Sequence, residues 1–372
     1  MNKKFETPMY VTKSALPTFE RYTEIIQQIW GARILTNNGP LHEKLAEELQ
    51  KYLNVANVTL FTNGHLALDC AIRSLDLKGE VITTPFTFVS TTHAISMNGL
   101  TPVFCDIKMS DYTIDENKIE SLITEKTCAI VPVHVYGHPC NVEKIQEIAD
   151  KHHLRVIYDA AHAFGVRVGG KGIAQFGDLS MFSFHATKVF NTIEGGAVVY
   201  NDGAYKTKLN LLKDFGISGP EDIDIIGLNA KMNEFQAAMG IANLETIDQK
   251  IENRKQAYSV YRNRLSSIPG LRFVDLPDNV TYNYSYLPVL VDETKFGMSR
   301  DALYTALTRY NVFARKYFYP LITNTVPYAQ MGANVPVAQY VSDRILCLPI
   351  FGDMTLAEAE QVCDIITEIY NK

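Results

Sequence analysis

Residues 156–165 read Val-Ile-Tyr-Asp-Ala-Ala-His-Ala-Phe-Gly, an apolar run that leads directly into Asp159. A run that is apolar on both faces is typical of a strand in a parallel sheet covered by helices. In open α/β sheets, ligands bind beyond the carboxyl ends of the strands. A carboxylate at such an end is a candidate functional group, because burying it without a partner is costly. Asp159 could also cap a following helix, and these residues alone leave both interpretations open.

The sequence around this stretch alternates between short apolar runs and amphipathic segments. Strands that alternate with helices indicate a layered α/β domain. The predicted strands are 58–62, 81–84, 101–106, 129–136, 155–159, 179–184 and 196–200. The predicted helices are 41–52, 66–75, 91–98, 114–123 and 141–152, after an irregular segment that ends near residue 40.

The pattern changes after about residue 245. Residues 244–267 predict a long polar helix, and beyond it lie a predicted strand at 286–291 and predicted helices at 299–310 and 355–370. A chain of 372 residues is long enough for two domains. We therefore predict a large domain with an N-terminal arm over 1–245, and a smaller α+β domain over 246–372.

A second candidate group lies in Ser183-Phe-His-Ala-Thr-Lys188, which is followed by Glu194-Gly-Gly. Lys188 comes just after an apolar strand and just before a glycine-bounded one. A lysine in such a turn, taken alone, is usually a solvated loop residue. A primary amine in a binding site, however, can form a Schiff base with an aldehyde cofactor.

Two further features complete a possible cofactor site. Asn63-Gly64-His65 is a turn between a strand and a helix, where backbone N–H groups favour a phosphate; plain βα turns look the same. Phe88 follows another predicted strand and could stack on a flat ring, or only pack in the core. With Asp159 available for a pyridinium nitrogen, these features match the groups that a protein contributes to pyridoxal-phosphate chemistry. The histidines have no metal-binding spacing, so no metal is expected.

The order and spacing of these motifs resemble the DegT-type sugar aminotransferases, a branch of the fold-type-I, aspartate-aminotransferase-like pyridoxal-phosphate enzymes. The resemblance covers essentially the whole chain. It includes Leu-Thr-Asn-Asn-Gly-Pro at 35–40, Pro-Val-His-Val-Tyr-Gly at 132–137, and residues 227–238. It implies an α/β large domain with a mostly parallel central sheet and a smaller α+β C-terminal domain.

The resemblance also implies roles around the cofactor ring. Lys188 forms the internal aldimine with pyridoxal 5'-phosphate and moves protons during catalysis. Asp159 faces the pyridine nitrogen, His162 lies near the ring and its 3-oxygen, and Phe88 stacks on the ring.

At the phosphate end, the resemblance implies binding by Gly64, His65 and Ser183, together with the partner subunit's Asn229. A site completed in this way requires at least a homodimer. The family usually has Thr or Ser where this chain has His65. The backbone amide is retained there, but the hydroxyl contact is not.

The implied activity is transfer of an amino group from L-glutamate to a nucleotide-linked keto sugar by a ping-pong mechanism. Residues 314–321 and 227–232 look most like the branch that acts on dTDP-4-keto-6-deoxyhexoses, as in deoxysugar biosynthesis for O-antigen or lipopolysaccharide. A dTDP-3-keto acceptor is the alternative. Arg315, Lys316 and Tyr317 are the candidate substrate-binding residues; the two cations could bind the diphosphate or the donor carboxylate, or be a solvated basic pair.

Three other classes of protein fit the sequence less well. A nicotinamide dehydrogenase is disfavoured, because the nearest glycine fingerprint, Gly-Lys-Gly-Ile-Ala-Gln at 170–175, lacks its last glycine. A non-catalytic regulator that binds a sugar nucleotide is disfavoured by the presence of Lys188 and Asp159. A pyridoxal dehydratase of the same fold can replace this lysine with histidine, whereas this chain keeps the lysine.

Composition and charge argue against several other classes of protein. The formal net charge of −6 argues against non-specific nucleic-acid binding. No apolar run is long enough to span a bilayer, and the first residues lack a signal-peptide core. The six cysteines form no C-x-x-C pair, which favours free thiols in a reducing compartment. A cytoplasmic enzyme without membrane or nucleic-acid partners is therefore expected.

Overall fold

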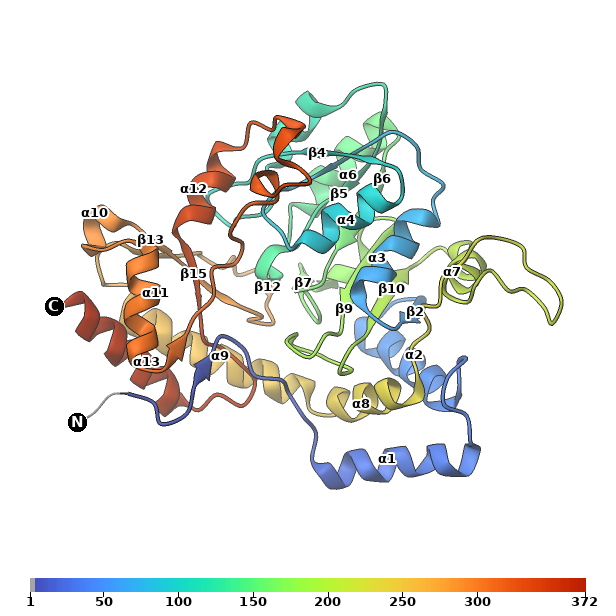
Figure 1. Ribbon diagram of the computed structural model, residues 1–372, viewed down its shortest axis with the longest axis horizontal. Coiled ribbons are helices and arrows are strands. Elements are labelled where there is room, and N and C mark those ends of the chain that lie inside the picture. Colours follow the sequence, from blue (N-terminus) through green and yellow to red (C-terminus); the bar gives the residue numbers. More distant parts are fainter. Residues whose placement is uncertain (1–3) are drawn as a thin grey trace.

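A seven-stranded sheet forms the centre of the molecule in the computed structural model, which describes residues 4–372 (Figure 1). Its strands lie in the order β2 (Asn57–Phe61), β10 (Gly196–Tyr200), β9 (Leu179–Ser183), β6 (Arg155–Asp159), β5 (Thr127–Val131), β3 (Glu80–Thr83) and β4 (Thr101–Phe104). Strand β10 is antiparallel to both of its neighbours, while the pairs from β9 to β4 are parallel. The predicted α/β fold with a mostly parallel sheet is confirmed.

Helices cover both faces of this sheet, as the predicted two-sided apolar strands require. Val156 and Tyr158 belong to one core cluster and Ile157 to another, because successive strand residues point to opposite faces. The first face is covered by α2 (Pro40–Leu53), α6 (Val142–His152) and α8 (Glu234–Leu244). The second is covered by α3 (Gly64–Arg73), α4 (Val89–Met97) and α7 (Tyr205–Lys213).

A second core surrounds the antiparallel sheet β11 (Leu271–Phe273), β13 (Leu287–Val291) and β15 (Ile345–Leu348). The helices α9 (Ile247–Leu265), α11 (Arg300–Arg309) and α13 (Leu356–Tyr370) contribute to it. The N-terminal arm joins this part of the chain, because β1 (Met9–Tyr10) pairs with β14 (Val312–Phe313). The division at residues 245 and 246 falls between α8 and α9 and stays a prediction.

Shorter elements complete the fold. They are α5 (Glu116–Ile119), α10 (Glu293–Phe296), α12 (Pro336–Arg344), the small sheet β12-β7-β8 (Val280–Thr281, Arg167–Val168, Lys171–Gly172) and 3-10 turns at Glu120–Leu122, Val135–Gly137, Ile173–Gln175, Ile322–Asn324 and Ala329–Met331. All six cysteines lie within the described residues and are free thiols. Within residues 4–372, no helix is both long and apolar enough to cross a membrane.

The expectation of an irregular segment up to residue 40 was wrong, because a 14-residue helix, α1 (Phe19–Ala32), lies within it. The hydroxyl of Thr18 caps this helix by accepting the N–H of Arg21 at 3.2 Å, and Ile25 and Ile29 are buried one turn apart. Other apolar residues of this helix, such as Phe19 and Trp30, are exposed, so the buried stripe is narrow and the apolar pattern did not mark one face.

Three other predicted elements are shorter than expected. The helix at 114–123 begins only at Glu116, after Asp115 caps the N–H of Asn117, and it ends as a 3-10 turn. The strand at 129–136 stops before Pro132, which has no N–H to donate to a sheet. The long helix predicted at 244–267 is α9, which spans only Ile247–Leu265, because Leu244 is the last residue of α8.

Candidate active site

A cavity of about 540 Å³ lies at the carboxyl ends of β6 and β9, next to the N-terminal ends of α3 and α4. This is the edge at which the fold predicts a ligand. The cavity brings together nine of the eleven predicted site residues: Gly64, His65, Phe88, Asp159, His162, Ser183, Lys188, Arg315 and Tyr317.

Asp159 is buried at the end of β6, where turns and then β7 follow it. The Thr91 hydroxyl donates to Oδ2 at 2.7 Å, and the N–H of Ala161 donates to Oδ1 at 3.1 Å. Burial raises the pKa of this carboxyl, while both hydrogen bonds and the charge of Lys188 oppose that rise. The site therefore holds a buried carboxylate whose charge is supported by two donors and a nearby cation.

Lys188 lies on the loop that joins β9 to β10 and is partly buried in the cavity wall. Burial and, to a smaller extent, the charge of Arg315 lower the pKa of its amine to about 8, against the opposing effect of Asp159. A lysine with this pKa has far more neutral amine near pH 8 than an exposed lysine has. The neutral amine is the form that can act as a nucleophile or base.

His162 is buried beside Asp159 and packs against the rings of Tyr286 and Phe318. Its Nδ1 accepts the backbone N–H of Tyr136 at 3.1 Å. Burial holds the pKa of the imidazole well below its usual value, so the ring is neutral. Because Nδ1 is an acceptor, the ring proton must lie on Nε2. His162 therefore has one N–H to offer.

The opposite end of the cavity suits an anion, because two helices begin there. Residues Gly64 and His65 start α3, and α4 begins at Val89 with no side-chain cap from the described residues. The Nδ1 of His65 and the Oγ of Ser90 are 2.8 Å apart and so join the two first turns. Free N–H groups at helix N-termini attract phosphate.

Gly64 keeps this end open. A Cβ atom at this position would lie 2.9 Å from the Cβ and 3.1 Å from the Oγ of Ser183. The absence of a side chain thus lets the Ser183 hydroxyl approach the start of α3. Both Ser183 and Gly64 line the cavity.

Comparison with known proteins agrees with this geometry. The sequence pattern of the DegT/DnrJ/EryC1/StrS aminotransferase family matches residues 19–367. The chain belongs to this family. The expected family membership is confirmed, and with it the assignment as an aminotransferase.

Similar proteins cover nearly all of this aminotransferase. It is 44% identical over 366 residues to the dTDP-4-amino-4,6-dideoxy-D-glucose transaminase of Shigella dysenteriae, which spans 98% of this chain and 100% of the relative. The Escherichia coli protein of the same name is 45% identical over 349 residues, covering 92% and 94%. The crystal structure of DesI, studied with its TDP-sugar product, superposes with a TM-score of 0.95 at 32% identity, covering 99% and 94%.

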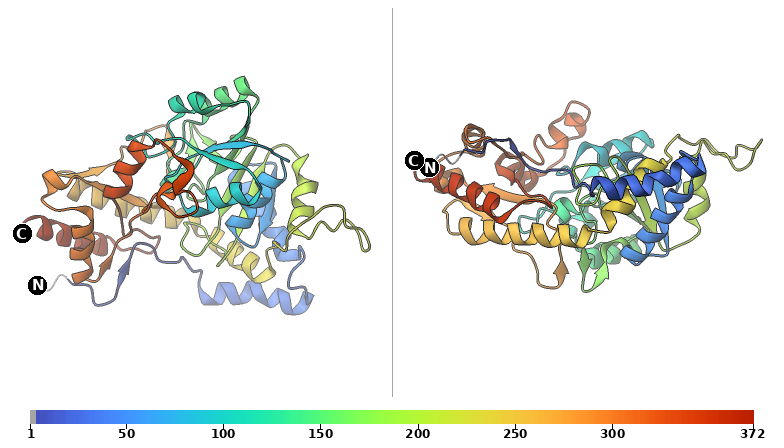
Figure 2. Two further views of the ribbon diagram at one scale, coloured as in Figure 1. Left: turned by 45° about the horizontal axis from the view of Figure 1, so that its top comes forward. Right: turned by 90° about the horizontal axis from the view of Figure 1, so that it is seen from below.

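Two predicted site residues of the aminotransferase lie outside this cavity. The Nζ of Lys316 is 2.6 Å from Oδ1 of Asp301 and lies over the ring of Tyr304. Asn229 is exposed, and its backbone pairs with Asp214 at the base of the segment between α7 and α8. That segment extends away from the body in both views of Figure 2.

Several residues of the site were not singled out from the sequence. Thr91 and Tyr136 support Asp159 and His162, and Ser90, Thr87 and Glu194 line the cavity. Thr87 and Ser90 lie within two positions of Phe88, and Glu194 stands beside two glycines. The partners of Thr91 and Tyr136 are distant in sequence, so no local signal identifies them.

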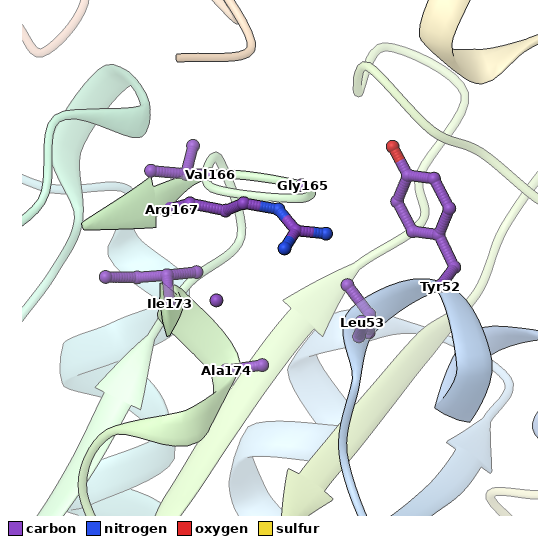
Figure 3. A pocket seen from close by; sticks show the side chains of 8 residues that line it. Tyr52, Leu53, Gly165, Val166, Arg167, Ile173 and Ala174 are labelled. Carbon is purple, nitrogen blue, oxygen red and sulfur yellow. The ribbon is translucent and has the colours of Figure 1, made fainter. Parts of the chain in front are cut away.

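A second hollow, between Tyr52 and the turn at Gly165–Arg167, is not a ligand site. Figure 3 shows the Arg167 side chain extending toward Tyr52 across it. Its volume of about 10 Å³ leaves room for roughly one water molecule.

Proposed function

We propose that this aminotransferase uses pyridoxal 5'-phosphate to move an amino group from L-glutamate to C4 of a dTDP-4-keto-6-deoxyhexose. The product is a dTDP-4-amino-4,6-dideoxyhexose. The observation that carries this proposal is the meeting of Lys188, Asp159 and His162 in one cavity that also has an anion-binding end. Two relatives at 44% and 45% identity that are named for a dTDP-4-amino sugar support the acceptor.

The residues present fit this cofactor. When bound, pyridoxal phosphate supplies a carbonyl for a primary amine and a ring that accepts electron density. Asp159 would hold the ring nitrogen protonated, and Phe88, whose exposed ring lines the cavity, would cover the ring. The backbone N–H groups of Gly64 and His65, with the Ser183 hydroxyl, would bind the phosphate.

Lys188 would attach the cofactor covalently and later act as base and acid. Its amine would take the proton from the α-carbon of the donor and would return a proton in the second part of the transfer. The lowered pKa of Lys188, about 8, supports the base role at neutral to mildly alkaline pH. His162, which lines the cavity, would offer its Nε2–H to an oxygen on the ring.

Arg315 and Tyr317 are the proposed substrate-binding residues. The Arg315 guanidinium lies 4.3 Å from the Tyr317 ring centroid, and both line the cavity. No carboxylate within residues 4–372 forms an ion pair with Arg315, so this cation is available for a donor carboxylate or a diphosphate. Lys316 stays a prediction, since its ammonium is engaged by Asp301.

The proposal includes a homodimer with shared sites. Asn229 lies outside its own cavity, and the segment before it exposes Phe215, Ile217, Ile223 and Ile226. Exposed apolar groups on a projecting segment favour contact with another chain. We assign Asn229 to the cofactor phosphate of the partner subunit.

The central test replaces the covalent anchor. We expect Lys188→Ala to bind pyridoxal phosphate only non-covalently and to lose turnover. Mass spectrometry after borohydride reduction and absorbance spectra measure the linkage directly. Near-normal turnover of Lys188→Ala would overturn the assignment.

The acceptor is tested with a panel of dTDP-, UDP- and GDP-linked keto sugars and L-glutamate, with mass spectrometry and NMR of the amino sugar. We expect amination at C4 of the dTDP sugar. Amination at C3, or of another nucleotide sugar, would replace this acceptor. A protein whose spectrum does not respond to glutamate would instead be a non-catalytic binder.

The shared site is tested by mixing two inactive variants under subunit exchange. Lys188→Ala and Asn229→Asp should complement each other, because a mixed dimer then has one site with both changes and one with neither. Activity per mixed dimer should approach that of one wild-type site. If exchange is verified by mass and activity does not rise, Asn229 serves its own subunit.

A further inference from the structure

Of the described residues, two acidic ones line the active-site cavity, Asp159 and Glu194. The proposed function uses Asp159 and gives no role to Glu194. About half of the Glu194 side chain is exposed to the cavity and the solvent. Its backbone is fixed, since its carbonyl accepts the Thr192 hydroxyl at 2.7 Å and the Gln236 amide at 2.6 Å. These two hydrogen bonds therefore fix the point from which the carboxylate extends into the cavity.

Glu194 ends a chain of polar contacts that runs from Thr187 through His185 on the loop that carries Lys188. The Nδ1 of His185 accepts the backbone N–H of Thr187 at 3.3 Å and lies 2.8 Å from the Thr187 hydroxyl. Nδ1 is thus an acceptor, which leaves Nε2 to carry the ring proton. That nitrogen is 3.4 Å from Oε1 of Glu194. His185, Thr187, Glu194 and Lys188 all line the same cavity, and this chain of polar contacts orients the carboxylate within its wall.

The charge of Glu194 distinguishes between the two substrates of a ping-pong transamination. L-Glutamate brings two carboxylates and a nucleotide sugar brings a diphosphate, and a nearby carboxylate repels each of these groups. A hexose ring also brings hydroxyl groups, which are good donors to a carboxylate. L-Glutamate has no hydroxyl. The donor group that L-glutamate does bring, its amino group, is the group that is transferred, so only the sugar brings donors that stay available to this carboxylate.

We propose that Glu194, oriented by His185, accepts a hydrogen bond from a ring hydroxyl of the sugar acceptor and so selects for the acceptor half of the reaction. The inference rests on the proposed function. It makes Glu194 a substrate-binding residue and His185 a positioning residue.

The test measures the two half-reactions separately on the holoenzyme by the absorbance of the cofactor. With L-glutamate, Glu194→Gln should react within about twofold of wild type. With dTDP-4-keto-6-deoxyglucose, the aminated enzyme should react about 10- to 100-fold more slowly per unit of substrate concentration, as expected for a lost hydrogen bond to a charged group. His185→Gln should slow the same half-reaction by a smaller factor.

Two controls separate this role from general effects. Glu125→Gln removes the same charge at an exposed position outside the cavity, and both half-reactions should be unchanged. Inhibition by dTDP, which carries no sugar ring, should be as strong for Glu194→Gln as for wild type. His185→Gln keeps the test decisive if Glu194→Gln does not fold.

Four results would overturn the inference. Equal slowing of both half-reactions would mean that Glu194 acts on Lys188 or the cofactor. Slowing with L-glutamate alone would mean that it binds the donor ammonium, and unchanged rates in both would mean that it has no role. Weaker dTDP inhibition would assign it to the nucleotide. A wild-type enzyme that fails with L-glutamate would instead refute the proposed function.

Discussion

Thr91 controls the charge of Asp159, and its replacement by valine measures that control. The Thr91 hydroxyl is fully buried and donates to Oδ2 of Asp159 at 2.7 Å. Its own oxygen is 2.9 Å from the Thr87 hydroxyl, which must be the donor of that pair, because the Thr91 proton is already used. Thr91→Val keeps the shape of the side chain and removes one donor to the carboxylate.

The size of the effect follows from this contact. A hydrogen bond to a charged group contributes about 1.5–3 kcal/mol. At about 1.4 kcal/mol per unit, its loss should raise the pKa of Asp159 by about 1–2 units. Burial already raises this pKa, and the Thr91 hydrogen bond is the largest opposing contribution. The carboxyl of the variant should therefore become neutral at a higher pH than that of wild type.

The assay is the pH profile of the half-reaction with L-glutamate, followed on the holoenzyme from pH 5 to pH 9. The acid limb should move toward neutral pH by about 1–2 units in Thr91→Val, so the loss is largest in acid and recovers as the pH rises. Thr91→Ser retains the hydroxyl and should keep the wild-type profile. An unmoved acid limb in Thr91→Val, or an equal shift in Thr91→Ser, would refute this reasoning.

Two further predictions concern packing and burial. Gly64→Ala should lower the affinity for pyridoxal phosphate and destabilise the fold by about 1–3 kcal/mol, because the new Cβ would meet Ser183 at 2.9 Å. Cofactor titration and thermal unfolding measure both effects, with Gly203→Ala as the control, since no described atom lies within 4 Å of a Cβ there. Wild-type cofactor affinity in Gly64→Ala would contradict the prediction. Lys213→Met should stabilise the protein at pH 7 by up to about 3 kcal/mol, because burial lowers the pKa of Lys213 to about 8 from 10.5. Between these two pKa values the unfolded chain binds more protons than the folded protein, so wild type gains stability as the pH rises and the advantage of the variant shrinks. Urea unfolding at pH 7 and pH 10 measures the free energy of unfolding of both proteins. A difference that stays the same at both pH values would contradict the cost of a buried cation.

The parts of the fold that the sequence predicts are those with a strong local signal. The central strands are apolar on both faces, Asp159 is the last residue of one of them, and Lys188 lies on the loop after another. Helix α1 buries a narrower stripe and was missed. A contact such as that between Thr91 and Asp159, 68 positions apart, depends on how α4 meets β6, and no local pattern contains it.

Arg315 and Lys316 show a second limit. The sequence presents them as one basic pair, but the backbone at Arg315 is extended and pairs with Cys347. Successive side chains of an extended segment point to opposite sides. Arg315 therefore faces the cavity, while Lys316 reaches Asp301. Which of two neighbouring cations faces a site depends on strand register, and composition carries no information about it.

The pairing of β1 with β14 has a consequence for synthesis on the ribosome. Met9 donates to the carbonyl of Asn311, and its strand partner is Val312, roughly 300 positions later. At about 5–20 residues per second, the partner strand is translated about 15–60 s after β1. During that interval, Phe5 and Met9, which are buried in the finished protein, have no native core to enter. A segment that is made about 300 residues before its partner strand is therefore among the last to reach its native place, and a chaperone could shield its apolar side chains until then.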